Sequence, residues 1–123
     1  MIMTQETLFT KIINREIPAD IVYEDDISLA FKDISPQAPF HVLIIPKKPI
    51  PTINDIESND RELIGHLYYV AGQLAKEHGF SDDGYRVVMN CNEHGGQTVF
   101  HIHLHMLAGK VLGWPPYTET AKV

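Results

Sequence analysis

Three histidines, His101, His103 and His105, alternate with apolar residues in one short stretch of the chain. A period of two is the strand period, so an extended backbone places the three imidazoles on one face and the apolar side chains on the other. Same-face residues lie roughly 6.5–7 Å apart along a strand. On a helix each step of two residues would rotate the side chain by about 200°, and no shared site would form. The pattern therefore predicts a functional strand over residues 100–107.

The histidine row has three possible roles. A row of surface histidines would only aid solubility, but three of the chain's seven histidines cluster here beside a glycine loop, which argues against this role. Neutral imidazoles are common metal ligands, and three of them can hold zinc with one position open. In the third role, one imidazole attacks a phosphate ester or amide while its neighbours position it. Composition does not separate the second role from the third.

The residues just before the row favour phosphorus chemistry. Gly95 and Gly96 can take positive φ and leave backbone amides bare, which makes an anion-holding loop feasible, although two glycines alone would indicate a plain turn. Gln97 and Thr98 add an amide and a hydroxyl that could donate to phosphate oxygens or to a leaving group. Together the four residues predict a phosphate-binding loop that leads into the histidine strand.

Three more polar residues lie at positions of interest. His41 is the one polar residue of an apolar run over residues 40–45, so it is a candidate orienter of the histidine row, although a satisfied core histidine is the commoner case. Asn90 ends a predicted strand and is either a cap or a substrate contact. Cys91 lies in no pattern that activates a thiolate, so we do not expect it to be a nucleophile.

Size and composition are those of one globular domain spanning residues 1–123, with ends at 1–5 and 117–123 that we expect to be flexible. The hydrophobic content of 44% and charged content of 21% are ordinary. A net charge of −6 argues against nucleic acid as the main partner. The single cysteine, the lack of a long apolar stretch and the lack of a secretory signal at the N-terminus predict a cytoplasmic protein without a membrane partner.

The hydrophobic pattern predicts an α+β fold. Helices are expected over residues 7–16 and 60–78, the longer one with a capping box at Asn59 and Glu62, a buried stripe that includes Leu63, and a C-terminal stop at Gly79. Strands are expected over residues 21–23, 27–31, 40–45, 85–90 and 100–107. These elements make a single-domain fold with about five strands in a mainly antiparallel sheet and two helices on one side of it.

The chain resembles the histidine triad (HIT) family, and within it the Hint branch, over residues 7–116. His101 to Leu107 match the triad signature, His-x-His-x-His followed by two apolar residues. The other matching blocks are Asp33-Ile34-Ser35-Pro36-Gln37-Ala38-Pro39, His41, Ile45-Pro46-Lys47-Lys48, Gly95-Gly96-Gln97-Thr98-Val99 and Trp114-Pro115-Pro116.

The resemblance implies a purine nucleoside phosphoramidate hydrolase that works as a homodimer on AMP- or GMP-type substrates. In the family, the middle histidine, here His103, attacks the α-phosphorus, expels an amine and leaves a nucleotidylated histidine for water to cleave. His101 and His105 correspond to the outer triad histidines, and His41 to the upstream supporting histidine. Thr98 corresponds to the leaving-group hydroxyl, where serine is frequent. The scheme requires no cofactor and no metal.

The resemblance also implies a set of substrate contacts. Asp33 corresponds to the residue that accepts from both ribose hydroxyls. The purine slot corresponds to Phe9, Ile12, Phe31 and Ile34. The phosphate contacts and the remaining substrate-binding positions correspond to Asn90, Gly96, Gln97, Val99 and Trp114.

Three alternatives remain open at this point. One is a dinucleoside polyphosphate hydrolase on the same fold, with the same nucleophile and a phosphate leaving group; the Trp114-Pro115-Pro116 ending favours the phosphoramidate hydrolase. Another is a zinc protein that uses His101, His103 and His105 as ligands. The last is a nucleotide-binding regulatory protein whose catalysis is incidental.

Overall fold

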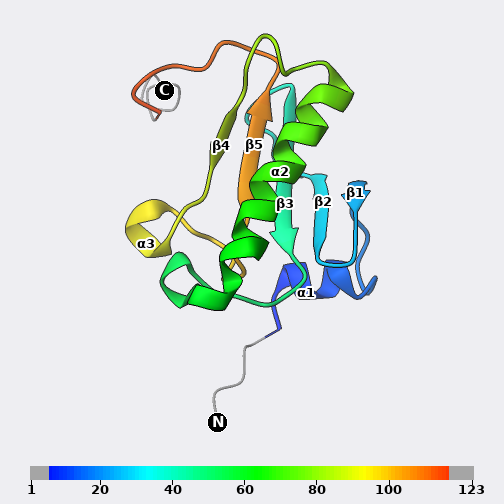
Figure 1. Cartoon of the computed structure of the whole chain (residues 1–123), viewed down its shortest axis with the longest axis vertical. Coiled ribbons are helices and arrows are strands. Elements are labelled where there is room, and N and C mark those ends of the chain that lie inside the picture. Colours follow the sequence, from blue (N-terminus) through cyan, green and yellow to red (C-terminus); the bar gives the residue numbers. More distant parts are fainter. Residues whose placement is uncertain (1–5, 117–123) are drawn as a thin grey trace.

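The backbone is organised by one five-stranded sheet with the strand order β1-β2-β3-β5-β4 (Figure 1). The computed structural model describes residues 6–116, so the predicted flexible ends, 1–5 and 117–123, lie outside the described residues. Every strand pairing is antiparallel, which confirms the predicted sheet. The strands are β1 Ile21–Glu24, β2 Ser28–Lys32, β3 Phe40–Pro46, β4 Arg86–Val88 and β5 Leu104–Ala108.

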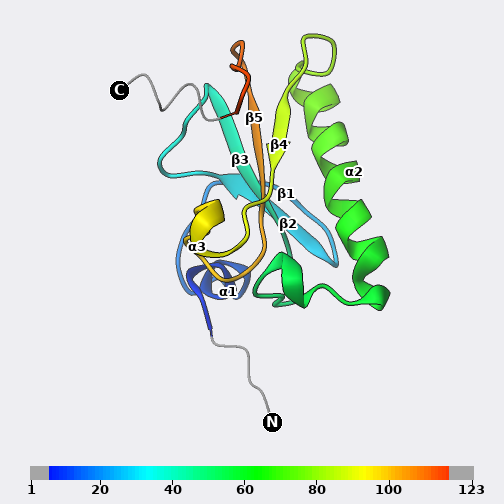
Figure 2. The same cartoon turned by 90° about the vertical axis from the view of Figure 1, so that its left-hand side faces the viewer.

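Helices cover both faces of this sheet, so the prediction of helices on one side is wrong. The long helix α2 (Arg61–His78) lies on one face, and the short helices α1 (Leu8–Ile13) and α3 (Asn92–Gly95) lie on the other (Figure 2). The reason is visible in β3, which is apolar at every position after His41 and therefore needs cover on both faces. Helix α3 falls in a segment that we predicted to be a loop. Two 3₁₀ turns, η1 (Ile53–Asp55) and η2 (Ser58–Asp60), precede α2.

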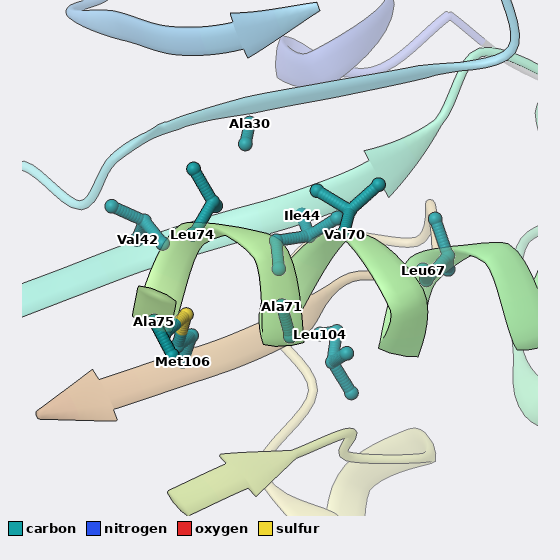
Figure 3. Close-up of a cluster of buried hydrophobic side chains, with 10 residues drawn as sticks. All are labelled: Ala30, Val42, Ile44, Leu67, Val70, Ala71, Leu74, Ala75, Leu104 and Met106. Atoms are coloured by element: carbon teal, nitrogen blue, oxygen red, sulfur yellow. The ribbon is translucent and has the colours of Figure 1, made fainter. Parts of the chain in front are cut away.

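The main hydrophobic core lies between α2 and the sheet (Figure 3). The helix contributes a stripe at helical spacing, and the strands contribute alternate residues of β2, β3 and β5. Leu63, which we predicted to be buried, is only half-buried, and the small residues Ala71 and Ala75 let the helix approach the sheet instead. The buried members are Ala30, Val42, Ile44, Leu67, Val70, Ala71, Leu74, Ala75, Leu104 and Met106.

A second, smaller core lies on the opposite face, under α1. It contains Phe9 and Ile12 of α1 together with Leu29 and Phe31 of β2 and Leu43 and Ile45 of β3. Helix α1 begins where the Thr7 side chain accepts the backbone N–H groups of Phe9 and Thr10. Because side chains alternate along β3, His41 shares the face of Leu43, so the histidines lie on the α1 face of the sheet.

The start of α2 differs from the prediction, whereas its end agrees. No capping box forms at Asn59 and Glu62, because the preceding 3₁₀ turn makes Asp60 the N-cap residue. The Asp60 carboxylate instead accepts the Glu57 N–H at 2.9 Å and the Lys48 ammonium at 2.5 Å. Gly79 ends the helix in the left-handed region with φ +81°, as predicted.

The histidine strand begins four residues later than predicted, at Leu104. Before it, the His101 imidazole donates from Nε2 to the Pro46 carbonyl at 2.7 Å, and the Ile102 N–H donates to the Ile50 carbonyl at 2.8 Å. Residues 101 and 102 are thus tied to the last residue of β3 and to the segment that follows it, outside the sheet ladder. Among the described residues, no helix is long and apolar enough to cross a membrane.

The loop that carries Asp33 is held against the end of β5 by a close packing contact. Gly109 has φ +97°, and a Cβ placed there would lie 2.9 Å from the Cβ of Pro39. We therefore expect Gly109→Ala to destabilise the protein by about 2–4 kcal/mol, through backbone strain and the clash together. Urea unfolding followed by circular dichroism would measure this change.

Gly65 provides the matched control. It lies within α2, and a Cβ placed there would meet no atom within 4 Å outside the helix's own backbone. Gly65→Ala should stabilise the protein by about 0.5–1 kcal/mol, because alanine favours the helix. Equal effects of the two substitutions would contradict the packing argument.

Candidate active site

A cavity of about 430 Å³ opens on the α1 face of the sheet, beside the histidines. Most of its lining residues are apolar, and the polar ones are Lys32, Asp33, Thr98, His103 and His105. Nine of the predicted site residues line it: Phe9, Ile12, Phe31, Asp33, Ile34, Thr98, Val99, His103 and His105. Sequence reasoning missed Leu8, Ile17, Pro18, Ala19, Lys32 and Leu43. Leu43 could have been predicted, because it lies two residues after His41 on β3 and therefore shares the face of His41. Local sequence patterns do not indicate that the other five residues line a cavity.

His103 is held in the tautomer that a nucleophile needs. Its Nδ1 lies 2.8 Å from the carbonyl oxygen of His101, which can only accept, so Nδ1 carries the proton. Nε2 of the neutral ring therefore keeps its lone pair. The Phe9 ring packs edge-on against the imidazole, with centroids 5.0 Å apart, and fixes its plane. The ring is buried in the cavity wall with one nucleophilic nitrogen.

His101 does not share this cavity. Its ring is almost fully buried, with Nε2 donating to the Pro46 carbonyl, and its Nδ1 has no hydrogen-bond partner among residues 6–116. Its backbone carbonyl is the group that holds His103. The structure therefore places His101 behind the His103 ring, where it anchors the turn into β5.

His41 and His105 form a chain of donors that starts at the backbone. The Gln37 N–H donates to Nδ1 of His41 at 3.0 Å, so the proton of the neutral His41 ring is on Nε2. Nε2 of His41 lies 2.9 Å from Nδ1 of His105 and donates to it. The neutral His105 ring then carries its own proton on Nε2. The two rings come together because β3 and β5 are neighbours, with Leu43 opposite His105.

Burial lowers the pKa of all four site histidines, because a charged imidazole loses its hydration in the protein interior. For His105 the pKa falls to about 4, since repulsion from His103 and His41 adds to the burial. The Asp33 carboxylate opposes the shift at His41, His103 and His105. At neutral pH these rings are therefore uncharged, and the tautomers above apply.

These lowered pKa values predict a loss of stability in mild acid. The unfolded chain takes up protons on these histidines near pH 6.5, whereas the folded chain takes them up only at lower pH. Between these values the unfolded state binds more protons, so the free energy of unfolding should fall as the pH drops from 6.5 toward 4. Urea unfolding at pH 7.5, 6.0 and 5.0 would measure the fall.

His105→Asn should reduce this pH dependence by removing the ring whose pKa is lowered to about 4. Some carboxyl groups also have a lowered pKa, but they gain protons only at lower pH. The change in stability in the upper part of the range from pH 6.5 to 4 therefore comes from the histidines. The carboxyl groups are those of Glu24, Asp25 and Asp60. A stability that is flat from pH 7.5 to 5.0 would contradict the prediction.

The tautomers also bear on the metal alternative. The three triad rings do not converge, because His101 points to Pro46 and Nδ1 of His103 points to a carbonyl. A different set, Asp33, His41 and His105, has ligand atoms within 4.8 Å of one another. Coordination there needs the lone pair of His41 Nε2, yet the Gln37 N–H fixes the proton on that nitrogen. The donor set does not fit a metal without breaking this bond.

The loop before the triad is built differently from the prediction. The Gly96 N–H donates to the Asn92 and Glu93 carbonyls at the end of α3, so it does not face a phosphate. The buried Gln97 amide donates to the Pro51 and Val99 carbonyls at 2.7 and 3.0 Å, and its oxygen accepts the Asn92 N–H. These side-chain bonds leave Gln97 no donor for a substrate. It holds the loop in place instead.

The available donors lie just beyond Gln97. Within residues 6–116, neither the N–H groups of Thr98 and Val99 nor the Thr98 hydroxyl has a hydrogen-bond partner. Both residues line the cavity that also contains His103. This part of the loop is where an anion can be bound.

Asp33 and Ile34 form the opposite rim. One Asp33 oxygen accepts the Ser35 N–H at 2.8 Å, and the other lies 3.5 Å from Nε2 of His41. Ile34 is 96% exposed and stands over the cavity mouth. A carboxylate beside an apolar slot suits a ligand that has both hydroxyl groups and a flat apolar ring.

Asn90 and Trp114 lie outside this cavity. Asn90 lines a second hollow of about 660 Å³, together with His41 and His105. Trp114 is 80% exposed, and the Arg86 guanidinium lies 6.0 Å from its ring centre. The structure therefore places Asn90 in the neighbouring hollow and Trp114 in neither of the two spaces.

Comparisons with known proteins agree with this arrangement. The model of the HIT domain family matches residues 14–112. The chain is 55% identical over 111 residues to the purine nucleoside phosphoramidase of Escherichia coli strain K12, covering 90% of this chain and 93% of that protein. It is 54% identical over 114 residues to an uncharacterised HIT-like protein of Synechocystis, covering 93% and 99%.

Solved structures give the same result. A HIT family hydrolase from Legionella pneumophila superposes with a TM-score of 0.88 at 54% identity, covering 90% of this chain and 99% of that one. A histidine triad nucleotide-binding protein from Candida albicans superposes with a TM-score of 0.75 at 29% identity, covering 95% and 91%.

Proposed function

Because this chain belongs to the HIT domain family, we propose that it hydrolyses purine nucleoside phosphoramidates through a covalent nucleotidyl-histidine intermediate. The observation that carries the proposal is the tautomer of His103, which leaves Nε2 unprotonated in the wall of a cavity of nucleoside size. The similarity to a purine nucleoside phosphoramidase over most of the chain supports the same reaction.

In the first step, Nε2 of His103 forms a bond to the α-phosphorus, and the P–N bond breaks. The amine leaves with the electron pair of that bond and takes a proton that the Thr98 hydroxyl relays from solvent. In the second step, water attacks the phosphorus and loses a proton to solvent, the Nε2–P bond breaks with its electron pair returning to Nε2, and the neutral His103 is regenerated with release of the nucleoside monophosphate. Thr98 suits the relay because its hydroxyl faces the cavity without a protein partner in the described part of the chain.

The charge that develops on the phosphoryl oxygens needs donors that are already in place. The backbone amides of Thr98 and Val99 and the Nε2–H of His105 supply them, and the relay from Gln37 through His41 keeps His105 in the donating tautomer. A group oriented before the reaction costs no reorganisation in the transition state. We assign His101 and Gln97 to positioning: one holds His103 and the other holds the loop.

The nucleoside occupies the cavity between α1 and the sheet. The purine ring lies on the apolar floor made by Phe9, Ile12 and Phe31, with Ile34 at the mouth. The ribose hydroxyls lie at the Asp33 carboxylate, which can accept from both.

The experiment that tests this reaction is rapid-quench mass spectrometry of the intact protein with adenosine 5′-phosphoramidate, under conditions that avoid acid. We expect a transient adduct of one nucleotidyl group, mapped to His103, followed by release of AMP. Turnover without such an adduct would favour direct attack by water. Metal analysis and a chelator control belong to the same experiment, because loss of activity with chelator would support the zinc alternative.

We also propose that the protein is a homodimer. The strand β4 is at the edge of the sheet, and within the described residues its outer side pairs with no other strand. An edge of this kind is a ready template for pairing with a second copy. Analytical ultracentrifugation should give about twice the chain mass of 13.9 kDa, and a single chain mass at all micromolar concentrations would contradict the dimer.

A further inference from the structure

Among residues 6–116, two residues other than glycine have a left-handed backbone: Arg15, with φ +62°, and Asn92, with φ +59°. This region is unfavourable for residues that carry a Cβ, although asparagine tolerates it better than most. Arg15 follows the end of α1, whereas Asn92 is the first residue of α3, six residues before Thr98. A strained backbone persists only where the surrounding structure holds it, so the contacts of Asn92 are informative.

Asn92 is bound through both of its backbone polar groups. Its N–H donates to the side-chain oxygen of Gln97 at 2.8 Å. Its carbonyl accepts the N–H groups of Gly96 and of Gln97, the second at 3.0 Å. These bonds close a ring over residues 92–97, which we term the Asn92 clamp. Because φ and ψ set the angle between the N–H and the carbonyl of a residue, the two bonds to Gln97 depend on the left-handed backbone.

The side chain of Asn92 takes no part in the clamp. It is exposed, and its amide has no hydrogen-bond partner in the part of the chain that the structure describes. The position therefore uses the backbone preference of asparagine and not its functional group. Glycine, which adopts positive φ without strain, would serve equally well there.

The clamp leads directly into the donors that we assign to the phosphoryl group. The buried Gln97 side chain also donates to the Pro51 carbonyl at 2.7 Å and to the Val99 carbonyl at 3.0 Å, which ties the clamp to the segment after β3. The next two residues are Thr98 and Val99, which line the cavity together with His103. Since Gln97 is bound at its backbone and at its side chain, it determines where the chain at Thr98 begins.

We propose that Asn92 is a positioning residue: its left-handed backbone holds Gln97 so that the free donors of Thr98 and Val99 face the phosphoryl group before the substrate binds. The proposal rests on the proposed hydrolysis of phosphoramidates and deepens it, because it traces the phosphoryl donors to a residue outside the cavity. Donors oriented in advance stabilise developing charge without reorganisation. Without the clamp these donors have to be ordered at each binding event, a cost that only phosphate-bearing ligands meet.

The test compares Asn92→Val with Asn92→Gly. A β-branched residue strongly disfavours φ near +59°, so valine should open the clamp, whereas glycine should keep it closed. For Asn92→Val we expect kcat for adenosine 5′-phosphoramidate and the affinity for AMP to fall by about 10-fold each, the worth of about one hydrogen bond to a charged group. The affinity for adenosine, which has no phosphate, should stay within about 2-fold, as should all three values for Asn92→Gly. Steady-state kinetics and calorimetric titration measure them.

Two further variants separate this role from a general loss of stability. Arg15→Val places the same side chain at the other left-handed position and also removes the ion pair with Glu24. It should lower the stability but leave the ratio of AMP affinity to adenosine affinity unaltered. Gln97→Ala should lower that ratio as Asn92→Val does. The double variant should be no worse than Gln97→Ala, because Asn92 acts through Gln97.

Normal kcat and AMP affinity in Asn92→Val, or equal losses of AMP and adenosine affinity, would overturn the proposal. A loss in Asn92→Gly as large as that in Asn92→Val would also overturn it, since the side-chain amide would then be the active group. If Asn92→Val does not fold, Asn92→Ala gives the same comparison with less strain. Failure of the unaltered protein to cleave the phosphoramidate would overturn the proposed function, whereas the two affinities would still test the clamp.

Discussion

Replacing His103 with alanine is expected to abolish turnover, with a loss in kcat of at least about 10⁴-fold. The variant lacks the cavity-lining imidazole whose Nε2 lone pair is left available because Nδ1 donates to the His101 carbonyl. Without it the phosphorus has no covalent partner, and water has to attack the P–N substrate directly. Steady-state release of AMP from adenosine 5′-phosphoramidate measures the loss.

Two further variants separate chemistry from folding. His103→Asn keeps a side-chain N–H near the His101 carbonyl but has no nucleophilic nitrogen, so it should be equally inactive and as stable as the unaltered protein. His78→Ala, at the exposed end of α2 on the other face of the sheet, should keep full activity. Calorimetric binding of AMP to both His103 variants should stay within about 10-fold of the unaltered protein. Normal hydrolysis by either would remove His103 as the nucleophile.

Replacing Asp33 with alanine should lower kcat/KM for ribonucleotide substrates by about 100-fold. Two hydrogen bonds from ribose hydroxyls to a carboxylate are lost, each worth about 1.5 kcal/mol as bonds to a charged group, and 1.4 kcal/mol corresponds to a factor of 10. The carboxylate lies at the rim of the cavity, with one oxygen directed toward His41 at 3.5 Å and the other on the Ser35 N–H.

The 2′-deoxy substrate is the control for this prediction. It makes only one of the two bonds, so the same substitution should cost it about 10-fold. Comparing kcat/KM of the two substrates on both proteins gives a double-mutant cycle, and the coupling isolates the bond to the 2′-hydroxyl. Equal losses for ribose and deoxyribose substrates would show that Asp33 acts through His41 or through the loop, and not through the sugar.

The proximity of Asp33 to His41 links the two halves of the site. His41 connects the loop over residues 33–39 to β5, because it accepts from Gln37 and donates to His105. Asp33 and His105, which we propose to contact the ribose and the phosphoryl group, are thus both linked to His41 of β3. A sheet strand between two packed faces holds such groups more firmly than a loop would.

Much of the site follows from the sequence alone. The alternation predicted that His103 and His105 face one side, and both line the cavity, whereas His101, at the same parity but before β5, lies outside it. The prediction that Phe9, Ile12 and Phe31 line a ligand cavity came from the resemblance to the HIT family, and these residues do line the cavity. The five-stranded antiparallel sheet and the left-handed stop at Gly79 were predicted from local sequence patterns. Local periodicity and backbone preference carry this information.

The tertiary structure alone decided which nitrogen is free and which donors are available. The His101 ring donates to the Pro46 carbonyl, 55 residues away in the chain, and the Gln97 side-chain amide donates to the Pro51 carbonyl, 46 residues away. The tertiary structure also decided that helices cover both faces and that Gln97 binds both backbone polar groups of Asn92. A residue type states what a side chain can donate or accept. Its actual partner depends on which distant backbone groups the fold brings within 3 Å, and no local pattern encodes that.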